Sequence, residues 1–441
     1  MARRNLFNAT IDCLNGSRIS LGRAHLLAST VLREAHRAGL PAEDITPLGS
    51  LRRCAPDIGD VSLLAVAPQS RHDEILDGFL RLPIVTSVVA KLPSSVEAAT
   101  GRGRVWLHVA APDAAGASLV WHTGARKHTS LLQARASRMG LTFRDAVLTR
   151  VNGTTVPTPD EDEVYRLLDL PYIAPEIREG LDEIDVAARG QLPVLVSSEH
   201  IRGDLHMHST WSDGQDSIQH MVLAAKRLGY EYVAITDHSE RTFASRKLLG
   251  LEIPIQREEI ESLRSRVSGI EILHGVEVEI MPDGSLDFDD TQLAGFDIVL
   301  ASLHDDQGHD PARLTDRYLR AIRHPLVNII THPANRSPAF SPGYDLDFDH
   351  LFEAAVKSGT AMEVDGAPGH LDMDGSIARR AVAAGVTIAI DGDCHRAESL
   401  ERQMRFGIGT ARRGWVQPAH VLNARNVDAV RAFVSRKRAG R

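Results

Sequence analysis

Residues 203–208 read GDLHMH, a short run in which His206 and His208 are separated by a single residue. Side chains at positions i and i+2 of a strand point to the same face, so both imidazoles can bind one cation. Further strand-like runs follow along the chain: YVAITDH (232–238), EILHGVEVEI (271–280), IVLASLH (298–304), NIITHP (328–333), AMEVDG (361–366) and TIAIDGDCH (387–395). Most of these runs carry or end in His, Asp or Glu.

Amphipathic stretches separate the runs and predict helices over residues 216–228, 257–267, 311–323, 348–358 and 376–384. Short strands that alternate with helices predict an α/β fold, with parallel strands joined by helical crossovers. In α/β barrels, reactive side chains gather where the carboxyl ends of the strands meet. We therefore expect the polar ends of these runs to form one site.

Nine side chains in this half have the chemistry of metal ligands: His206, His208, Asp213, His238, Glu277, His304, His332, Asp393 and His395. Six imidazoles and three carboxylates suffice for two to three divalent ions at three or four protein ligands each. The mixture of nitrogen and oxygen donors favours manganese or zinc, and also suits iron, because magnesium and calcium prefer oxygen alone. Strand alternation places Glu279 on the same face as Glu277 and does not choose between them.

Composition indicates an ordinary cytoplasmic protein with room for two or three domains. The chain has 441 residues, of which 43% are hydrophobic, and only three cysteines. No apolar run is long enough to span a bilayer, so we expect no membrane partner. Net charge is −8, yet residues 91–150 hold nine Lys and Arg against three Asp and Glu, a local charge of +6. Such a segment can contact phosphates, or it can be a solvated helix-rich face.

The motifs HxH, TDH, GxE, SLH, HP and DxH in this order resemble the PHP (polymerase and histidinol phosphatase) domain. The resemblance implies a distorted seven-stranded α/β barrel and three ligand sets: His206, His208, Glu277 and Asp393; then Glu277, His304 and His332; then Asp213, His238 and His395. It thereby favours Glu277 over Glu279. It also implies that His206, His208, Glu277, Asp393 and His395 are catalytic.

The N-terminal half resembles the palm and thumb of bacterial family X DNA polymerases, an α+β nucleotidyltransferase-like module. The matching stretches are LGSLRR (48–53), IGDV (58–61), HTGARKH (122–128) and LDLPYIAPEIRE (168–179). The resemblance implies a palm and thumb module over residues 1–180, a linker over 181–202 and a PHP barrel over 203–441. It also implies that the chain begins near the palm, without the usual lyase-like and fingers regions.

This palm departs from the family at its metal ligands. The Gly-Ser turn is present as Gly49 and Ser50, and the first carboxylate as Asp60, but Ser62 and Trp106 stand where the other two carboxylates belong. Two-metal nucleotidyl transfer needs carboxylates to hold both cations, and a neutral hydroxyl or an indole cannot replace them. We therefore expect polymerization to be lost.

Together these features predict a phosphoesterase acting on DNA single strands or 3′ ends, as a 3′-to-5′ exonuclease, 3′-phosphatase or abasic-site endonuclease. The alternatives are a phosphatase of small phosphate esters, of the histidinol-phosphatase type, and a non-enzymatic DNA-binding scaffold. Arg336, Arg241 and Lys247 follow ligand loops and are candidates to bind phosphate. Asp237 and His309 lie near ligands and are acid candidates, with structural roles as the simpler interpretation. Partner proteins are not indicated by any motif.

Overall fold

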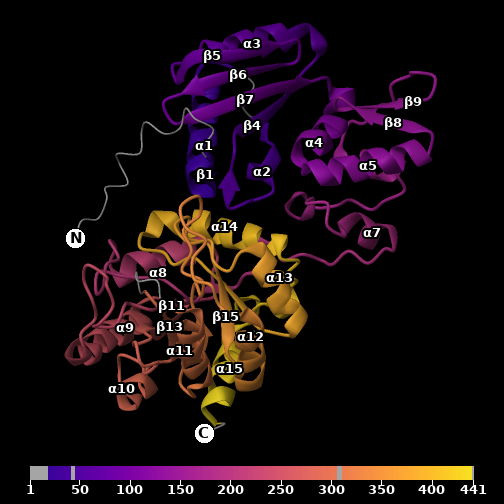
Figure 1. Ribbon diagram of the computed structural model, residues 1–441. Coiled ribbons are helices and arrows are strands. Elements are labelled where there is room, and N and C mark those ends of the chain that lie inside the picture. The colour runs from indigo at the N-terminus through magenta and orange to yellow at the C-terminus, as the bar shows by residue number, and fades with distance from the viewer. Residues whose placement is uncertain (1–17, 41–44, 305–309, 440–441) are drawn as a thin grey trace. The chain divides into compact units, whose positions relative to one another are not determined.

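The computed structural model describes residues 18–40, 45–304 and 310–439, which form two compact units, residues 1–192 and 193–441 (Figure 1). The predicted linker, residues 181–202, is thus divided between the two units. His309 lies outside the described residues. Within the described ranges, no helix has the length and apolarity needed to cross a bilayer.

The second unit is built on a parallel sheet of seven strands in sequence order. The strands are β10 (Gly203–Asp204), β11 (Tyr232–Ile235), β12 (Glu271–Glu279), β13 (Ile298–Ser302), β14 (Ile329–Ile330), β15 (Ala361–Asp365) and β16 (Ile388–Asp391). A parallel bridge between Met207 and Cys394 joins the two ends of the sheet. The predicted α/β barrel is confirmed, because each strand enters the sheet beside its predecessor and the last meets the first.

Helices cross between successive strands of the barrel, and the final two helices follow the last strand. They are α8 (Ile218–Arg227), α9 (Ile253–Arg266), α10 (Asp290–Ala294), α11 (Pro311–Arg323), α12 (Phe348–Ser358), α13 (Gly375–Ala384), α14 (Leu400–Arg413) and α15 (Val427–Ala439). The five helices predicted from the pattern are all present. Helix α9 begins earlier than expected because Pro254 lies in its first turn, where a proline ring is tolerated.

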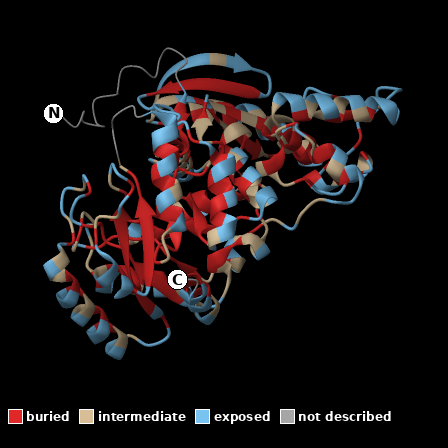
Figure 2. Cartoon of the chain, turned by 60° about the horizontal axis from the view of Figure 1, so that its bottom comes forward, coloured by how far each residue is buried: buried red, intermediate tan, exposed pale blue. Residues whose placement is uncertain are grey.

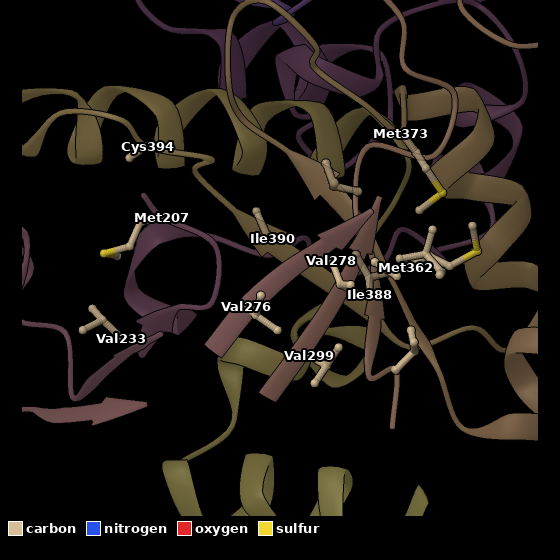
Figure 3. Packing of buried hydrophobic residues seen from close by; sticks show 14 of the residues in the cluster. Met207, Val233, Val276, Val278, Val299, Met362, Met373, Ile388, Ile390 and Cys394 are labelled. Atoms are coloured by element: carbon tan, nitrogen blue, oxygen red, sulfur yellow. The ribbon is translucent and has the colours of Figure 1, made fainter. Parts of the chain in front are cut away.

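Apolar side chains cover both faces of the barrel wall, which is almost wholly buried (Figure 2). Met207 and Cys394 belong to the outer core, together with Val276, Val278 and Ile390 (Figure 3). Helix α15 contributes Val430, Phe433 and Val434 to the second cluster, which includes Leu205, Leu273 and Leu300. Successive side chains of a strand point to opposite faces. Because the side chains between the ligands pack into the outer core, the ligand side chains point to the interior of the barrel.

The first unit contains a mixed five-stranded sheet in the order β2-β4-β7-β6-β5. Its strands are β2 (Ile45–Pro47), β4 (Val61–Val66), β5 (Val85–Leu92), β6 (Ser95–Thr100) and β7 (Gly103–Ala110). Two separate short sheets are formed by β1 (Ile19–Ser20) and β3 (Asp57–Ile58), and by β8 (Leu141–Arg144) and β9 (Val147–Arg150). The helices are α1 (Leu21–Arg37), α2 (Gly49–Arg52), α3 (His72–Leu80), α4 (Ala115–Thr123), α5 (Arg126–Arg138), α6 (Glu161–Leu167) and α7 (Glu183–Ala188). Strands β4 and β7 are parallel, and Ser62 lies opposite Trp106.

The sequence pattern of residues 117–140, which ends in glycine, predicts one helix, and this prediction is wrong in detail. The chain forms α4 and α5, separated by Gly124 and Ala125 in extended conformation. A Cβ at Gly124 would lie 2.7 Å from the ring of His128, so the turn needs glycine. The Ala125 N–H donates to the Arg178 carbonyl at 2.9 Å, a contact between distant segments that local periodicity cannot reveal.

Arg52 of LGSLRR and Arg178 of LDLPYIAPEIRE both form ion pairs with Glu161. Arg52 donates two hydrogen bonds to Glu161, at 2.9 and 2.6 Å, and Arg178 donates to the same carboxylate at 2.5 Å. Arg178 is fully buried and lies over the rings of Tyr165 and Tyr172, 5.2 and 5.3 Å from the centroids. Residues from the two motifs most typical of the polymerase module therefore form one buried ionic network.

Replacement of Arg178 by methionine removes one of the two positive charges that balance the buried Glu161 carboxylate. We expect this change to lower the free energy of unfolding of the first unit by about 3–5 kcal/mol. Urea unfolding followed by tryptophan fluorescence measures the loss. The control is Arg166→Ala, which removes an exposed arginine paired with Glu163 on α6 and should change stability by less than about 1 kcal/mol. Equal stability of both variants would contradict the structural role.

Candidate functional site

The predicted ligands gather at the carboxyl end of the barrel. His206 and His208 follow β10, His238 follows β11, Glu277 lies in β12, His304 follows β13, His332 follows β14, and Asp393 and His395 follow β16. Asp213 lies on the loop that leads to α8. Parallel strands bring all these ends to one edge, which is why residues spread over almost two hundred positions meet.

Glu277 lies at the centre of the cluster, with each carboxylate oxygen facing different imidazoles. Oε2 lies 2.9 Å from His238 Nδ1, 3.3 Å from His206 Nε2 and 3.4 Å from His208 Nε2; Oε1 lies 3.0 Å from His332 Nε2 and 3.8 Å from His304 Nε2. A carboxylate with separate partners on its two oxygens is arranged to bridge two neighbouring cations.

The remaining ligands complete two sets around this centre. Asp393 Oδ1 lies 3.0 Å from His208 Nε2 and 3.6 Å from His206 Nε2. Asp213 Oδ1 lies 3.1 Å from His395 Nε2 and 3.6 Å from His238 Nε2. The structure thus brings together the members of each of the three expected sets.

The donor atoms fit divalent cations. Zinc binds imidazole at about 2.0–2.1 Å, so ligand atoms on one ion lie about 3.0–3.4 Å apart. Several buried atoms are also without a hydrogen-bond partner among the described residues, namely Glu277 Oε2, Asp213 Oδ1 and His238 Nδ1. His238 Nδ1 and Glu277 Oε2 are 2.9 Å apart without hydrogen-bond geometry. Polar atoms that converge in this way, buried and unpaired, are arranged for an ion.

Electrostatics in the cluster favour added positive charge. Burial would raise the pKa of Glu277, but the imidazoles of His238 and His206 hold it well below its usual range. Burial would lower the pKa of His332, but Glu277 raises it to about 9. Burial itself lowers the pKa of His208 to about 3, which leaves that ring neutral as a metal ligand must be.

Two carboxylates outside the predicted set orient the imidazoles. Glu363 Oε1 accepts a hydrogen bond from His206 Nδ1 at 2.7 Å, and Glu279 Oε2 accepts one from His304 Nδ1 at 2.8 Å. Each contact leaves Nε2 as the ring atom that faces Glu277. This arrangement fixes the tautomer and direction of a metal-binding histidine. The run AMEVDG carried the signal for Glu363, since it lies on the remaining strand of the barrel.

Buried acids hold the loops that carry the ligands. Asp237 accepts hydrogen bonds from the backbone and hydroxyl groups of Ser209 and Ser212 and from Gln256, at 2.6 to 3.0 Å. Its oxygens are therefore occupied in positioning the loop before Asp213, as the simpler interpretation of this residue expected. Asp204 accepts from the backbone of His206 and Gly392, and its burial raises its pKa to about 7.

Access to the cluster is from one side. Asp213, His304 and His395 have side-chain exposures of 21%, 20% and 33%, whereas His206, His208 and Glu277 are fully enclosed. The candidate phosphate-binding residues differ in their surroundings. Arg336 is buried and donates to Asp374 at 3.1 Å, Arg241 is mostly exposed beside Asp287, and Lys247 is half-buried on the loop after His238.

The residues predicted for the palm site lie together but do not form a comparable cluster. Ser62 Oγ donates to Asp60 Oδ2 at 3.0 Å, and Trp106 lies across from Ser62 on β7. Gly49 and Ser50 begin α2. Among the described residues of 1–192, no three His, Cys, Asp or Glu side chains bring donor atoms within ligand distance of one another.

Glu363→Gln should weaken metal binding without removing a ligand. Because the neutral amide holds the His206 ring less firmly, we expect the affinity for manganese or zinc to fall by about 10- to 100-fold. Competition with a chelator of known affinity measures this. The control, Glu353→Gln, changes an exposed residue paired with Lys357 on α12. An affinity equal to that of the unchanged protein would contradict the orienting role.

Glu277→Gln and Asp213→Asn should differ in the number of ions lost. Because the two oxygens of Glu277 face separate sets, its replacement should deplete two sets, whereas Asp213→Asn should deplete one. Metal content per chain after gel filtration, measured by inductively coupled plasma mass spectrometry, distinguishes these results. Equal losses in both variants would argue against a bridging Glu277.

Comparison with known proteins gives a separate family match in each of the two units. Residues 204–334 match the PHP domain, and residues 118–179 match the DNA polymerase beta thumb. A Bacillus subtilis (strain 168) protein named DNA polymerase/3′-5′ exonuclease PolX is 34% identical over 88% of this chain and 68% of its own length. A protein of Thermoanaerobacter sp. (strain X514) named "Probable phosphatase" is 33% identical over 44% of this chain and 78% of its own length.

The PHP match covers the ligand runs from His206 to His332, and the thumb match lies in the first unit. A protein of Syntrophotalea carbinolica, also named "Probable phosphatase", is 29% identical over 45% of this chain and 81% of its own length. The PHP domain and these relatives show that the chain is a hydrolase of phosphoesters, of a class that depends on metal ions. The chain therefore belongs to the bacterial PolX family, in which a polymerase module precedes a PHP domain.

Proposed function

We propose that this chain is a phosphoesterase that acts on DNA ends, as a 3′-to-5′ exonuclease, a 3′-phosphatase or an abasic-site endonuclease, and that nucleotide addition by its palm is lost. The observation that carries the hydrolytic part is Glu277, whose two oxygens face two groups of imidazoles. The proposal for the palm rests on Ser62 and Trp106, which leave Asp60 as its remaining ligand carboxylate.

Three groups of residues would hold the ions. The first is His206, His208, Glu277 and Asp393; the second is Glu277, His304 and His332; the third is Asp213, His238 and His395. When bound, such ions lower the pKa of water and neutralise charge on phosphate oxygens, which is the chemistry of phosphoester hydrolysis. Manganese or zinc suits these donors best, and iron is compatible with them.

The protein's own residues prepare the site for that chemistry. Glu363 and Glu279 keep the Nε2 atoms of His206 and His304 directed at the centre. Asp237 fixes the loop before Asp213, so this ligand is positioned before substrate arrives. The enclosed residues exclude bulk water, and the exposed edges of His304 and His395 leave the side from which a phosphate can enter. Arg336 and Lys247, with Arg241, remain the predicted phosphate contacts.

The exposed basic residues of the first unit favour DNA as the substrate. Of the nine basic residues between 91 and 150, all but Arg135 are exposed: Lys91, Arg102, Arg104, Arg126, Lys127, Arg138, Arg144 and Arg150. An exposed set of this kind can neutralise phosphates along a strand. The thumb match and the PolX relative point the same way.

A small phosphate ester is the second candidate substrate, because the proteins named as phosphatases match only the PHP half of the chain. Salt dependence separates the two substrates. Binding of DNA should fall steeply as salt rises, because counterions are released, whereas a small ester should respond far less.

The direct test uses a 5′-labelled oligonucleotide that carries a 3′-phosphate, incubated with manganese. A ladder of shorter products indicates an exonuclease, and a single mobility shift without shortening indicates a 3′-phosphatase. His206→Ala should abolish the products, whereas His220→Ala, which changes an exposed histidine on α8, should not. An unchanged band with metal-loaded protein, together with turnover of a small phosphate ester, would overturn the proposal for DNA. Extension of a primer by added nucleotides would overturn the proposal for the palm.

A further inference from the structure

The palm contains a cavity of about 740 Å³ on one face of its sheet. Strand register places Ser62 and Leu64 of β4 opposite Trp106 and His108 of β7, so these side chains share that face. Trp121 and His122 of α4 form the facing wall. We call this space the palm cavity. Its volume lies within the range of about 300–1,000 Å³ found for small-molecule sites.

Several flat rings line the palm cavity. The rings of Trp106 and His108 are stacked, with centroids 5.8 Å apart and planes 14° from parallel, and His108 lies 4.1 Å from His122. Burial lowers the pKa of His108 to about 4 and that of His122 to about 3, so both rings are neutral at pH 7. Ser94 and Gln69 add groups that can donate and accept hydrogen bonds.

The charges of the palm cavity are unsuited to a nucleoside triphosphate. Its charged lining residues are Asp60 and Asp145, and among the described residues that line it none is lysine or arginine. A triphosphate brought without cations would meet two carboxylates and no compensating charge. Arg104 and Arg144 are exposed and are close in sequence to the lining residues Trp106 and Asp145. They lie outside the lining, where they can contact a strand's phosphates.

We propose that the palm cavity receives an unpaired nucleobase of single-stranded DNA, stacked on Trp106 and held without metal ions. Trp106, which stands where a carboxylate of the palm belongs, would thus supply the ring on which the base stacks. Stacking on an aromatic ring suits every base, because each has a flat π face. The neutral rings and hydroxyl groups match the base, and the arginines outside match the phosphates. The inference rests on the proposed action on DNA and specifies the single strand as the form that the first unit holds.

The test compares two oligonucleotides of equal length and charge, one with all bases and one with abasic residues, by fluorescence anisotropy in EDTA. We expect the intact protein to bind the base-containing strand about 5- to 150-fold more tightly. Trp106→Ala should remove this preference, and Trp106→Phe should retain most of it. Val88→Ala, at an exposed position on β5 of the same sheet, is the matched control and should retain it in full.

Several results would overturn the inference. They are equal binding of both strands by the intact protein, a preference that survives in a folded Trp106→Ala variant, and a nucleoside triphosphate with magnesium that binds more tightly than the strand. Hydrolysis is measured separately with manganese. If the intact protein discriminates bases but does not hydrolyse DNA, the inference about the palm cavity stands and the proposed reaction fails.

Discussion

The constraint on which the second unit depends is a carboxylate buried among imidazoles at the end of a parallel barrel. Glu277 is fully enclosed, and a charge taken out of water needs compensation close by. Five imidazoles supply that compensation from the ends of four other strands, which can meet only because parallel strands present their carboxyl ends together. The outward side chains between the ligands, such as Met207 and Cys394, bind this edge to the core, so catalytic geometry and packing are set by the same strands.

The described part of the first unit contains no comparable group of metal-ligating side chains. The network of Arg52, Glu161 and Arg178 joins two of the stretches on which the resemblance to family X polymerases rests. On the sheet, Ser62 lies opposite Trp106, at the two positions where we propose that ligand carboxylates are missing. Asp60 is exposed and lies outside this ionic network.

Much of the barrel could be predicted from the sequence. Runs such as IVLASLH and NIITHP end in residues of one chemical class, and their spacing left room for helices, so the α/β class followed from periodicity. The members of the ligand sets could be assigned only by resemblance, since alternation treats Glu277 and Glu279 alike. The structure separates them: one faces the cluster and the other holds His304. Glu363 escaped prediction because its role depends on a partner 157 residues away. The break at Gly124 escaped for the same reason, since a long-range contact with Arg178 ends α4.

The claim that the chemistry lies at Glu277 and has left the palm is tested most directly by anomalous diffraction. Crystals grown with manganese would be measured above and below the manganese absorption edge. The account predicts anomalous peaks on both sides of the Glu277 carboxylate and none between Asp60 and Trp106. A strong peak beside Asp60, or none near Glu277 in a crystal of catalytically active protein, would contradict it.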